Sequence, residues 1–144
     1  MFVFAILSFV AGSVVYIVYI GLRYGQWVGS GDFGVALCCG LFSYATVAVP
    51  VWTGVMALAR VELSYRAVPD HWRWIIHLAL PPIVAILPTA GTTFILGGTP
   101  RAVLSPEGLS FLVLFTAAGA TFGAGWHICY GARRWTRANE RGDG

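Results

Sequence analysis

Four long apolar stretches fill most of this chain, and none of them contains an Asp, Glu, Lys or Arg. They cover residues 2–22, 33–59, 74–96 and 109–132. Each is as long as or longer than the roughly 20 apolar residues that a helix needs to cross about 30 Å of hydrocarbon. A helix satisfies its own backbone hydrogen bonds, which is what a bilayer demands. The sequence therefore predicts an all-α, polytopic membrane protein with four transmembrane helices in a single membrane domain, residues 1–144.

The basic residues indicate how the chain is oriented. All nine are arginines, and seven of them follow spans two and four: Arg60, Arg66, Arg73, Arg133, Arg134, Arg137 and Arg141. Arg23 and Arg101 lie in the other two connections. Loops rich in Lys and Arg stay in the cytoplasm, so both termini and the middle loop are predicted to be cytoplasmic (N-in/C-in). The absence of Lys beside abundant Ala, Gly and Arg is typical of a GC-rich bacterial genome, and the inner membrane is the predicted location.

The net charge of +3 is therefore not a signal for nucleic acid. Basic side chains beside a membrane attract anionic lipid headgroups. We expect membrane lipid to be a partner at the inner boundary, and the candidates for headgroup contact are Arg66, Arg133, Arg134 and Arg137.

Prolines interrupt the middle two spans. Pro50 lies inside span two, and Pro81, Pro82 and Pro88 lie inside span three. Proline removes a helical hydrogen bond, so both spans are predicted to be kinked, with span three partly unwound near residues 78–82. Broken helices in transporters can coordinate a substrate, and a small channel or carrier is one alternative. Its polar lining would be Thr46, Thr53, Thr89, Thr92 and Thr93.

Span four carries a clear helix start and a dense run of small residues. Ser105 is a suitable N-cap, followed by Pro106 at the first helical position and Glu107 near the positive end of the dipole. Gly119 and Gly123 have the GxxxG spacing that lets two helices approach closely, and Ala120 and Ala124 adjoin them. This surface packs either within the chain's own bundle or against a second copy or another membrane protein.

Two histidines in different spans lie at matching depth. His77 is four residues beyond Arg73 and His127 is six before Arg133. At 1.5 Å per residue, both lie about 6–9 Å from the inner boundary. Such a pair can supply both axial ligands of a haem b. Intramembrane histidines also hydrogen-bond between helices, handle protons or bind a metal, and these alternatives stay open.

The cysteines offer one further pattern. Ala36–Leu41, which contains the vicinal pair Cys38–Cys39, resembles the first span of mercuric-ion uptake proteins over six residues, and that resemblance implies a thiol site for a soft ion. By residue count, Cys39 lies about 30 Å from the inner boundary and Cys129 only about 6 Å. The three thiols do not make one site at those depths, and we interpret them as small buried apolar residues.

The sequence contains no catalytic motif, so an enzyme is not predicted. The leading hypothesis is a non-catalytic inner-membrane protein that acts through helix–helix contacts, as an accessory, assembly or immunity-type subunit of a membrane complex. A bis-histidine haem b subunit using His77 and His127 and a channel or carrier on spans two and three are the alternatives.

Overall fold

Helices make up almost all of the residues that the computed structural model describes, which are 2–25, 31–65 and 69–139. The elements in chain order are α1 (Phe2–Tyr24), α2 (Gly31–Ser43), the π-helical turn η1 (Tyr44–Ala48), α3 (Val49–Tyr65), α4 (Asp70–Ile83), α5 (Ile86–Ile95), the 3₁₀ turn η2 (Pro100–Leu104) and α6 (Pro106–Asn139). Because α2, η1 and α3 follow one another directly, they form one rod.

The described residues contain four segments that are long and apolar enough to cross a membrane. They are Phe2–Tyr24, Leu37–Leu63, Trp72–Ile95 and Pro106–Tyr130. The predicted all-α class and the number of spans are confirmed. The second segment ends four residues later than expected, because helical hydrogen bonding in α3 continues past the last wholly apolar residue.

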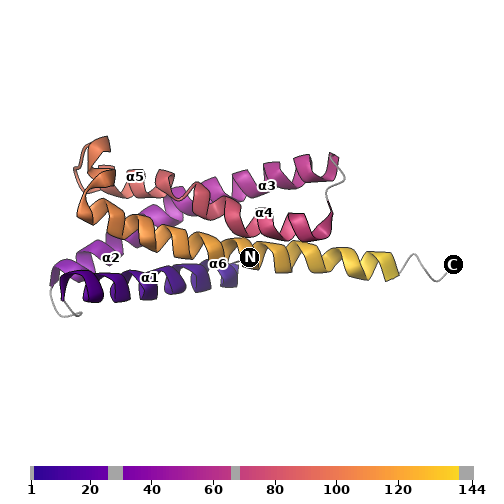
Figure 1. Cartoon of the computed structure of the whole chain (residues 1–144), viewed down its shortest axis with the longest axis horizontal. Helices are drawn as coiled ribbons and strands as arrows, with labels where there is room; N and C mark the ends of the chain where they lie inside the picture. The colour runs from indigo at the N-terminus through magenta and orange to yellow at the C-terminus, as the bar shows by residue number, and fades with distance from the viewer. Residues whose placement is uncertain (1, 26–30, 66–68, 140–144) are drawn as a thin grey trace.

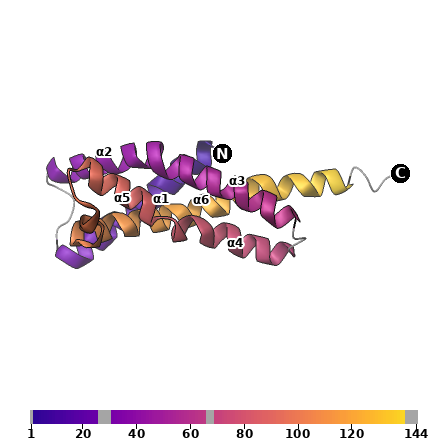
Figure 2. The ribbon, with the colours of Figure 1, turned by 90° about the horizontal axis from the view of Figure 1, so that it is seen from above.

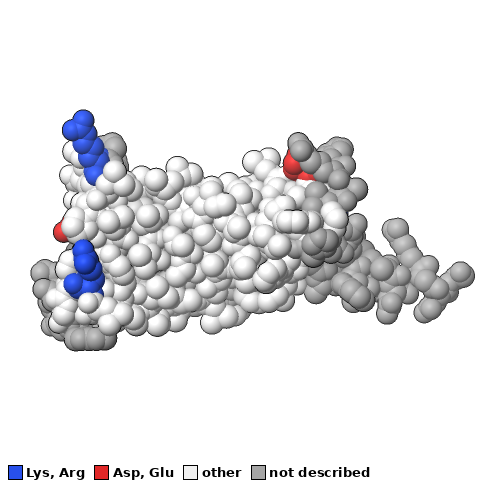
Figure 3. All heavy atoms as spheres, viewed as in Figure 1, with Lys and Arg blue, Asp and Glu red and all other residues white. Residues whose placement is uncertain are grey.

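Successive spans run in opposite directions along a long, narrow bundle (Figure 1). The end of α3, the start of α4 and the C-terminal part of α6 lie at one end, and η2 lies at the other. The same alternation is visible from above (Figure 2). Charged atoms on the face shown in Figure 3 gather at the two ends, and the length between them carries none. This distribution suits a bundle whose flanks contact hydrocarbon.

α6 is the central helix of the bundle, in contact with α1, α4 and α5. Small residues let its neighbours approach. A Cβ added to Gly119 would lie 2.9 Å from the Pro81 carbonyl carbon, and one added to Gly123 would lie 2.1 Å from the His77 oxygen. On the α1 side, a Cβ added to Gly12 would lie 2.6 Å from the Leu114 carbonyl oxygen. Close backbone approach of this kind replaces the hydrophobic driving force that lipid does not provide.

Ser105 begins α6 as expected. Its Oγ accepts a hydrogen bond from the backbone N–H of Gly108 at 3.1 Å, three residues on. Pro106 is the first helical residue and Glu107 stands in the first turn. The predicted helix start is therefore confirmed.

Span two widens immediately before its proline. Pro50 has no N–H, and its ring crowds the carbonyl four residues back, which is that of Thr46. In η1 the Val49 N–H donates instead to the Tyr44 carbonyl, five residues back. The Thr46 hydroxyl donates to the Phe42 carbonyl at 2.7 Å. The π turn is the local change that accompanies this proline, and the wider turns of such segments often lie at functional sites.

Span three is interrupted between α4 and α5. The prolines 81 and 82 lie in the last turn of α4, and Val84–Ala85 form the turn that follows. Pro88 has no N–H to offer the Val84 carbonyl, which accepts from the Leu87 N–H at 3.1 Å instead. Thr89 donates its hydroxyl to the Ala85 carbonyl at 2.8 Å. The interruption thus falls just beyond the expected residues 78–82, where carbonyls regain partners within their own segment.

A row of aromatic rings fills the space between α3 and α6. Trp52 on α3 lies 5.5 Å, centroid to centroid, from Phe122 on α6, and Phe122 lies 6.3 Å from Trp126. Trp52, Phe122 and Trp126 are at most 4% exposed, and Met56 is fully buried one turn after Trp52. Tilted rings at these separations pack closely and hold the two helices in fixed register.

Candidate functional site

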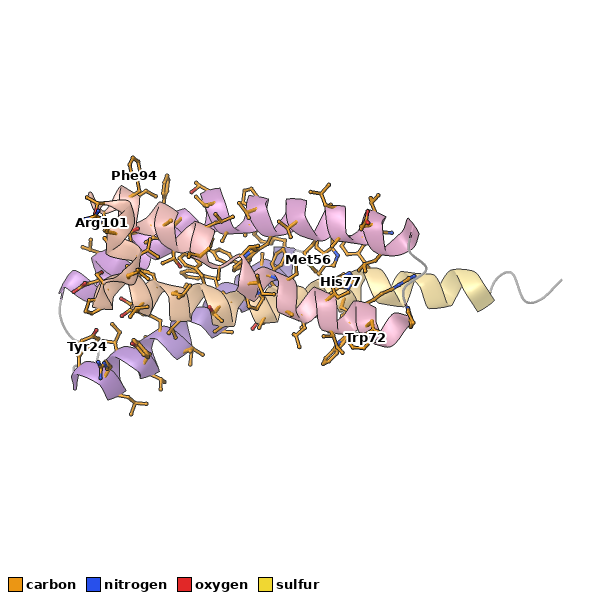
Figure 4. The ribbon with its side chains drawn as sticks, turned by 45° about the horizontal axis from the view of Figure 1, so that its top comes forward. Tyr24, Met56, Trp72, His77, Phe94 and Arg101 are labelled. Carbon is orange, nitrogen blue, oxygen red and sulfur yellow. The ribbon has the colours of Figure 1, made fainter. Side chains whose placement is uncertain are left out.

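The structure brings the two predicted histidines into direct contact. His77 on α4 and His127 on α6 approach with their Nδ1 atoms 3.3 Å apart and their ring centroids 5.5 Å apart. The rings are inclined by 54°. Figure 4 shows His77 on α4, closer than Trp72 to the middle of the bundle. Sequence reasoning had predicted only that the two residues lie at similar depth.

Gly123 is the reason that these side chains meet. Because it has no Cβ, the α4 backbone at His77 comes to the surface of α6. His127 follows Gly123 by four residues, about one helical turn, and lies on the same face of α6. The imidazoles therefore meet one turn beyond the point where the helices are closest.

The protonation states of this pair are linked by its geometry. A ring nitrogen donates only when it carries a proton, so in the neutral pair one Nδ1 donates and the other accepts. The accepting imidazole then carries its own proton on Nε2. Nε2 of His77 is buried and has no hydrogen-bond partner. The couple therefore presents an unsatisfied nitrogen inside the bundle.

Two arginines stand beside the histidine couple. The charges of Arg73 on α4 and Arg60 on α3 both act on His77. The Arg73 guanidinium donates to the Leu63 carbonyl at 3.5 Å, which links α4 to α3. Arg60 lies over the Tyr130 ring of α6, 5.1 Å from its centroid, in a cation–π contact. These four basic side chains come from three helices, and the contacts of the two arginines link α4 to α3 and α3 to α6.

The histidine couple as it stands does not fit a haem. Axial ligands approach the iron from opposite faces of the macrocycle. Here the Nδ1 atoms face each other directly, and the space beside Gly123 and Gly125 is filled by the His77 carbonyl and the Phe4 ring. A haem between the rings would require α4 and α6 to separate, so no electron-transfer step is derived through one, and that hypothesis stays a prediction.

Metal ligands do not gather elsewhere in the described chain. No group of three or more His, Cys, Asp or Glu side chains there could hold a metal ion. All three cysteines are free; Cys38 is exposed, and Cys39 and Cys129 are partly buried. The interpretation of the cysteines as buried apolar residues is therefore wrong for Cys38, which lies on an outward side of α2.

The GxxxG surface of α6 packs inside the chain. Gly119 and Gly123 are buried against α4, as the close approaches above require, and Ala120 and Ala124 beside them are partly buried. Of the two predicted uses of this surface, the intrachain contact is the one that the structure contains. Docking of a partner on Gly119 and Gly123 is incompatible with that contact.

The threonines of the channel hypothesis do not line a common path. Thr89 and Thr92 are fully buried, and their hydroxyls donate to carbonyls of their own helix. Thr93 does the same, to Ala90. Thr46 and Thr53, in contrast, are exposed on the outside of span two.

The outward side of span two carries an unusual run of small residues, which sequence reasoning missed. Between Phe42 and Leu58, every exposed residue is small or a proline. These residues form what we call the small-residue face: Ala45, Thr46, Pro50, Thr53, Gly54 and Ala57. A Cβ added to Gly54 would meet nothing within 4 Å. The spacing of these residues was visible in the sequence, but their direction was not.

Tyr44 makes a second contact that the sequence did not reveal. It is buried, and its hydroxyl donates to the Ala5 carbonyl of α1 at 2.8 Å and contacts the Ser8 hydroxyl. Ser8 itself donates to the Ala5 carbonyl at 3.0 Å. These bonds tie the π turn to α1.

The four arginines expected at lipid headgroups cannot be placed. Arg66 lies outside the described residues, and the side chains of Arg133, Arg134 and Arg137 lie outside them too.

Comparison with protein-family models, with characterised proteins and with solved structures finds no match. The function must therefore be argued from the chain's own geometry.

Proposed function

We propose that this chain is a non-catalytic, multi-pass membrane protein that acts through helix–helix contacts, as an accessory, assembly or immunity-type subunit of a membrane complex. The observation that carries the proposal is the small-residue face of η1 and α3. Interfaces between transmembrane helices are enriched in Gly, Ala, Ser and Thr, because these residues let backbones approach. A surface that only contacts lipid has no need of them.

The same chain shows what it does with small residues when a helix covers them. Gly12, Gly119 and Gly123 each lie against a neighbouring backbone. Gly54 has the same capacity for close approach and is uncovered. The occupant that suits it is an apolar transmembrane helix of another membrane protein, packed lengthwise along α3.

The face lies at the depth where such a helix would cross. Pro50 stands near the middle of the Leu37–Leu63 segment, and Ala45 and Ala57 lie on either side of it. A partner helix would contact the π turn and α3 together. A π turn exposed to a partner suits an interface, because its extra residue changes which side chains point outward.

For the orientation, we infer that both termini and the α3–α4 connection face the cytoplasm of a bacterial cell, with the chain in the inner membrane. The arginine distribution supports this, and so does the antiparallel course of the spans. Arg66, Arg133, Arg134 and Arg137 would then stand beside the headgroups of the inner leaflet. A reporter fused after residue 144 should be active in the cytoplasm, and activity only in the periplasm would reverse the orientation.

Site-specific photo-crosslinking in native membranes tests the partner proposal. A photoreactive side chain at Leu58, which is 72% exposed at the edge of the small-residue face, should crosslink to one defined protein. The substitution Gly54→Leu should remove that product by filling the place of closest approach. We expect an affinity loss of about tenfold, which corresponds to about 1.4 kcal/mol.

The matched control places the same photoreactive group at Leu7 of α1, which is 51% exposed among bulky neighbours. It should give no protein product. A product at twice the chain's mass of 15.5 kDa would show that the face joins two copies, which contradicts the proposed partner. Equal crosslinking from Leu7 and Leu58, unaffected by Gly54→Leu, would remove the proposal altogether.

A further inference from the structure

The histidine couple is a contact between two helices that depends on protons, and the helix-docking function does not use it. His77 of α4 and His127 of α6 approach with their Nδ1 atoms 3.3 Å apart, and both side chains are partly buried. The contact lies one helical turn from Gly123, where the α4 backbone lies against α6. The number of protons on the couple therefore bears directly on how α4 is held to α6.

The couple has three protonation states, and only two of them allow the contact. With no added proton, one Nδ1 donates and the other accepts. With one added proton, the imidazolium still donates to its neutral partner, and the bond becomes charge-assisted. With two added protons, both Nδ1 atoms carry hydrogen and neither accepts. Two like charges then face each other where the effective dielectric constant is lower than in water, so the contact is lost with the second proton.

Other charged groups surround the couple, and histidine differs from them in the pH range of its titration. The charges of Arg60 and Arg73 act on His77 together with that of His127. The described charged and titratable side chains on the neighbouring parts of the packed helices are Arg60 and Glu62 on α3, Arg73 on α4, and Cys129 and Tyr130 on α6. The side chains of Asp70, His71 and residues 131–139 lie outside the described part. Among these residue types, histidine is the one whose ordinary charge change falls between pH 5 and 8.

The interruption of span three gives α4 a place at which it can bend away. α4 ends at Ile83, and the turn at Val84–Ala85 separates it from α5. Prolines in the last turn of α4 and in the first turn of α5 remove helical hydrogen bonds, and helices bend at such points. α4 lies against α6 at Pro81, near the turn, and again at His77, farther from it. Loss of the imidazole bond would therefore release the part of α4 that lies farther from the turn.

We propose that the histidine couple is a pH-sensitive switch between α4 and α6. It holds the first half of α4 against α6 while it carries at most one added proton, and the second proton releases it. The two protons of such a pair bind in coupled steps within the range in which histidine titrates, so release grows as the pH falls from 8 to 5. The movement takes α4 away from Gly123 and uncovers a surface of α6 that the closed bundle keeps from any other helix.

Pulsed electron paramagnetic resonance on the full chain in lipid nanodiscs tests the switch. The native cysteines are replaced by serine, and spin labels are attached to new cysteines at Ile75 of α4 and Ile128 of α6, which are 44% and 57% exposed. We expect one distance at pH 8 and a second, longer distance at pH 5. The ratio of open to closed molecules should rise at least about tenfold, because two like charges at this separation repel strongly even at an effective dielectric constant near 20. An unchanged distance at every pH would overturn the switch.

Single histidine variants separate a couple from one titrating group. His77→Gln and His127→Gln should each remove the longer distance at pH 5, because the glutamine amide accepts from the remaining imidazolium and only one charge is present. Persistence of the longer distance in either variant would show that one histidine suffices, and the couple would not be the switch. His71→Gln is the matched control, since His71 is the third histidine of the chain, and it should keep the response. Loss of the response there would assign it to His71 instead.

A second pair of labels distinguishes release of α4 from general unfolding in acid. The labels are attached at Val3 of α1, which is 64% exposed, and at Ile128. α1 contains no histidine or carboxylate side chain, so its distance from α6 should stay the same between pH 8 and pH 5. If both label pairs separated at pH 5, acid would open the whole bundle and the switch would be wrong. The switch does not involve the small-residue face, so crosslinking from Leu58 can succeed or fail independently of it.

Discussion

α1 and span two both present an outward side to the surroundings, and the two sides are built from different residues. α1 exposes branched apolar side chains along its length, among them Val3, Ile6, Val10 and Val14, each at least 50% exposed. Span two exposes the small-residue face over the corresponding depth. Long apolar side chains suit fluid lipid, whereas small ones leave backbone uncovered and suit another helix. The difference teaches that uniform hydropathy along a membrane protein can conceal surfaces with distinct roles.

The largest expected effect separates covered from uncovered glycines. Gly123→Ala places a Cβ 2.1 Å from the His77 carbonyl oxygen, so the helices must move apart. We expect the free energy of unfolding in detergent to fall by about 1–3 kcal/mol, as overpacking usually costs. Gly54→Ala meets no atom within 4 Å and should leave stability unchanged or raise it by up to about 1 kcal/mol.

Unfolding titrations in mixed micelles measure both variants. Equal effects at the two positions would mean that Gly123 is not buried against α4, and the contrast between covered and uncovered glycines would disappear. A loss of stability in the Gly123 variant alone would strengthen this contrast, since stability and partner binding would then depend on different glycines.

A smaller effect tests how α1 is held from its inward side. Tyr44→Phe removes the hydroxyl that donates to Ala5 and contacts Ser8. We expect a loss of about 0.6–1 kcal/mol, typical of an interhelical hydrogen bond in a membrane. Proteolytic cleavage and amide hydrogen exchange should also become faster in α1 than in α6 in this variant, because α1 lies at the edge of the bundle. Tyr24→Phe, at an exposed tyrosine, is the control and should change neither quantity.

Sequence reasoning could predict the number of spans and the depth of residues, because both follow from composition and from the rise per residue. It placed His77 and His127 at one level correctly. It could not predict that their rings touch, because rotation about each helix axis is not fixed when all faces of a helix are apolar. Gly119 and Gly123 left two uses open for the same reason. The position of α4 decides between them, because its backbone lies against both glycines.

The direction of the small-residue face is a second feature that the sequence could not predict. Pro50 was visible as a helix breaker, but the π turn before it shifts which residues point outward, and a regular 3.6-residue period does not anticipate that shift. The sequence therefore contained the residues of the face without its direction. Where a proline changes the helical period, hydropathy alone cannot separate surfaces that contact lipid from surfaces that contact protein.

The smallest expected effect lies on the α1 side of the comparison. Val10→Leu and Val14→Leu each add one methylene to a side chain that is just over 50% exposed. If lipid is the neighbour, the acyl chains yield to the added volume, and stability should stay within about 0.5 kcal/mol of the native value. Crosslinking from Leu58 should also be unaltered. A clear loss of stability or of crosslinking would mean that α1 also contacts a protein. Bulky and small outward surfaces would then not distinguish lipid from protein neighbours in this bundle.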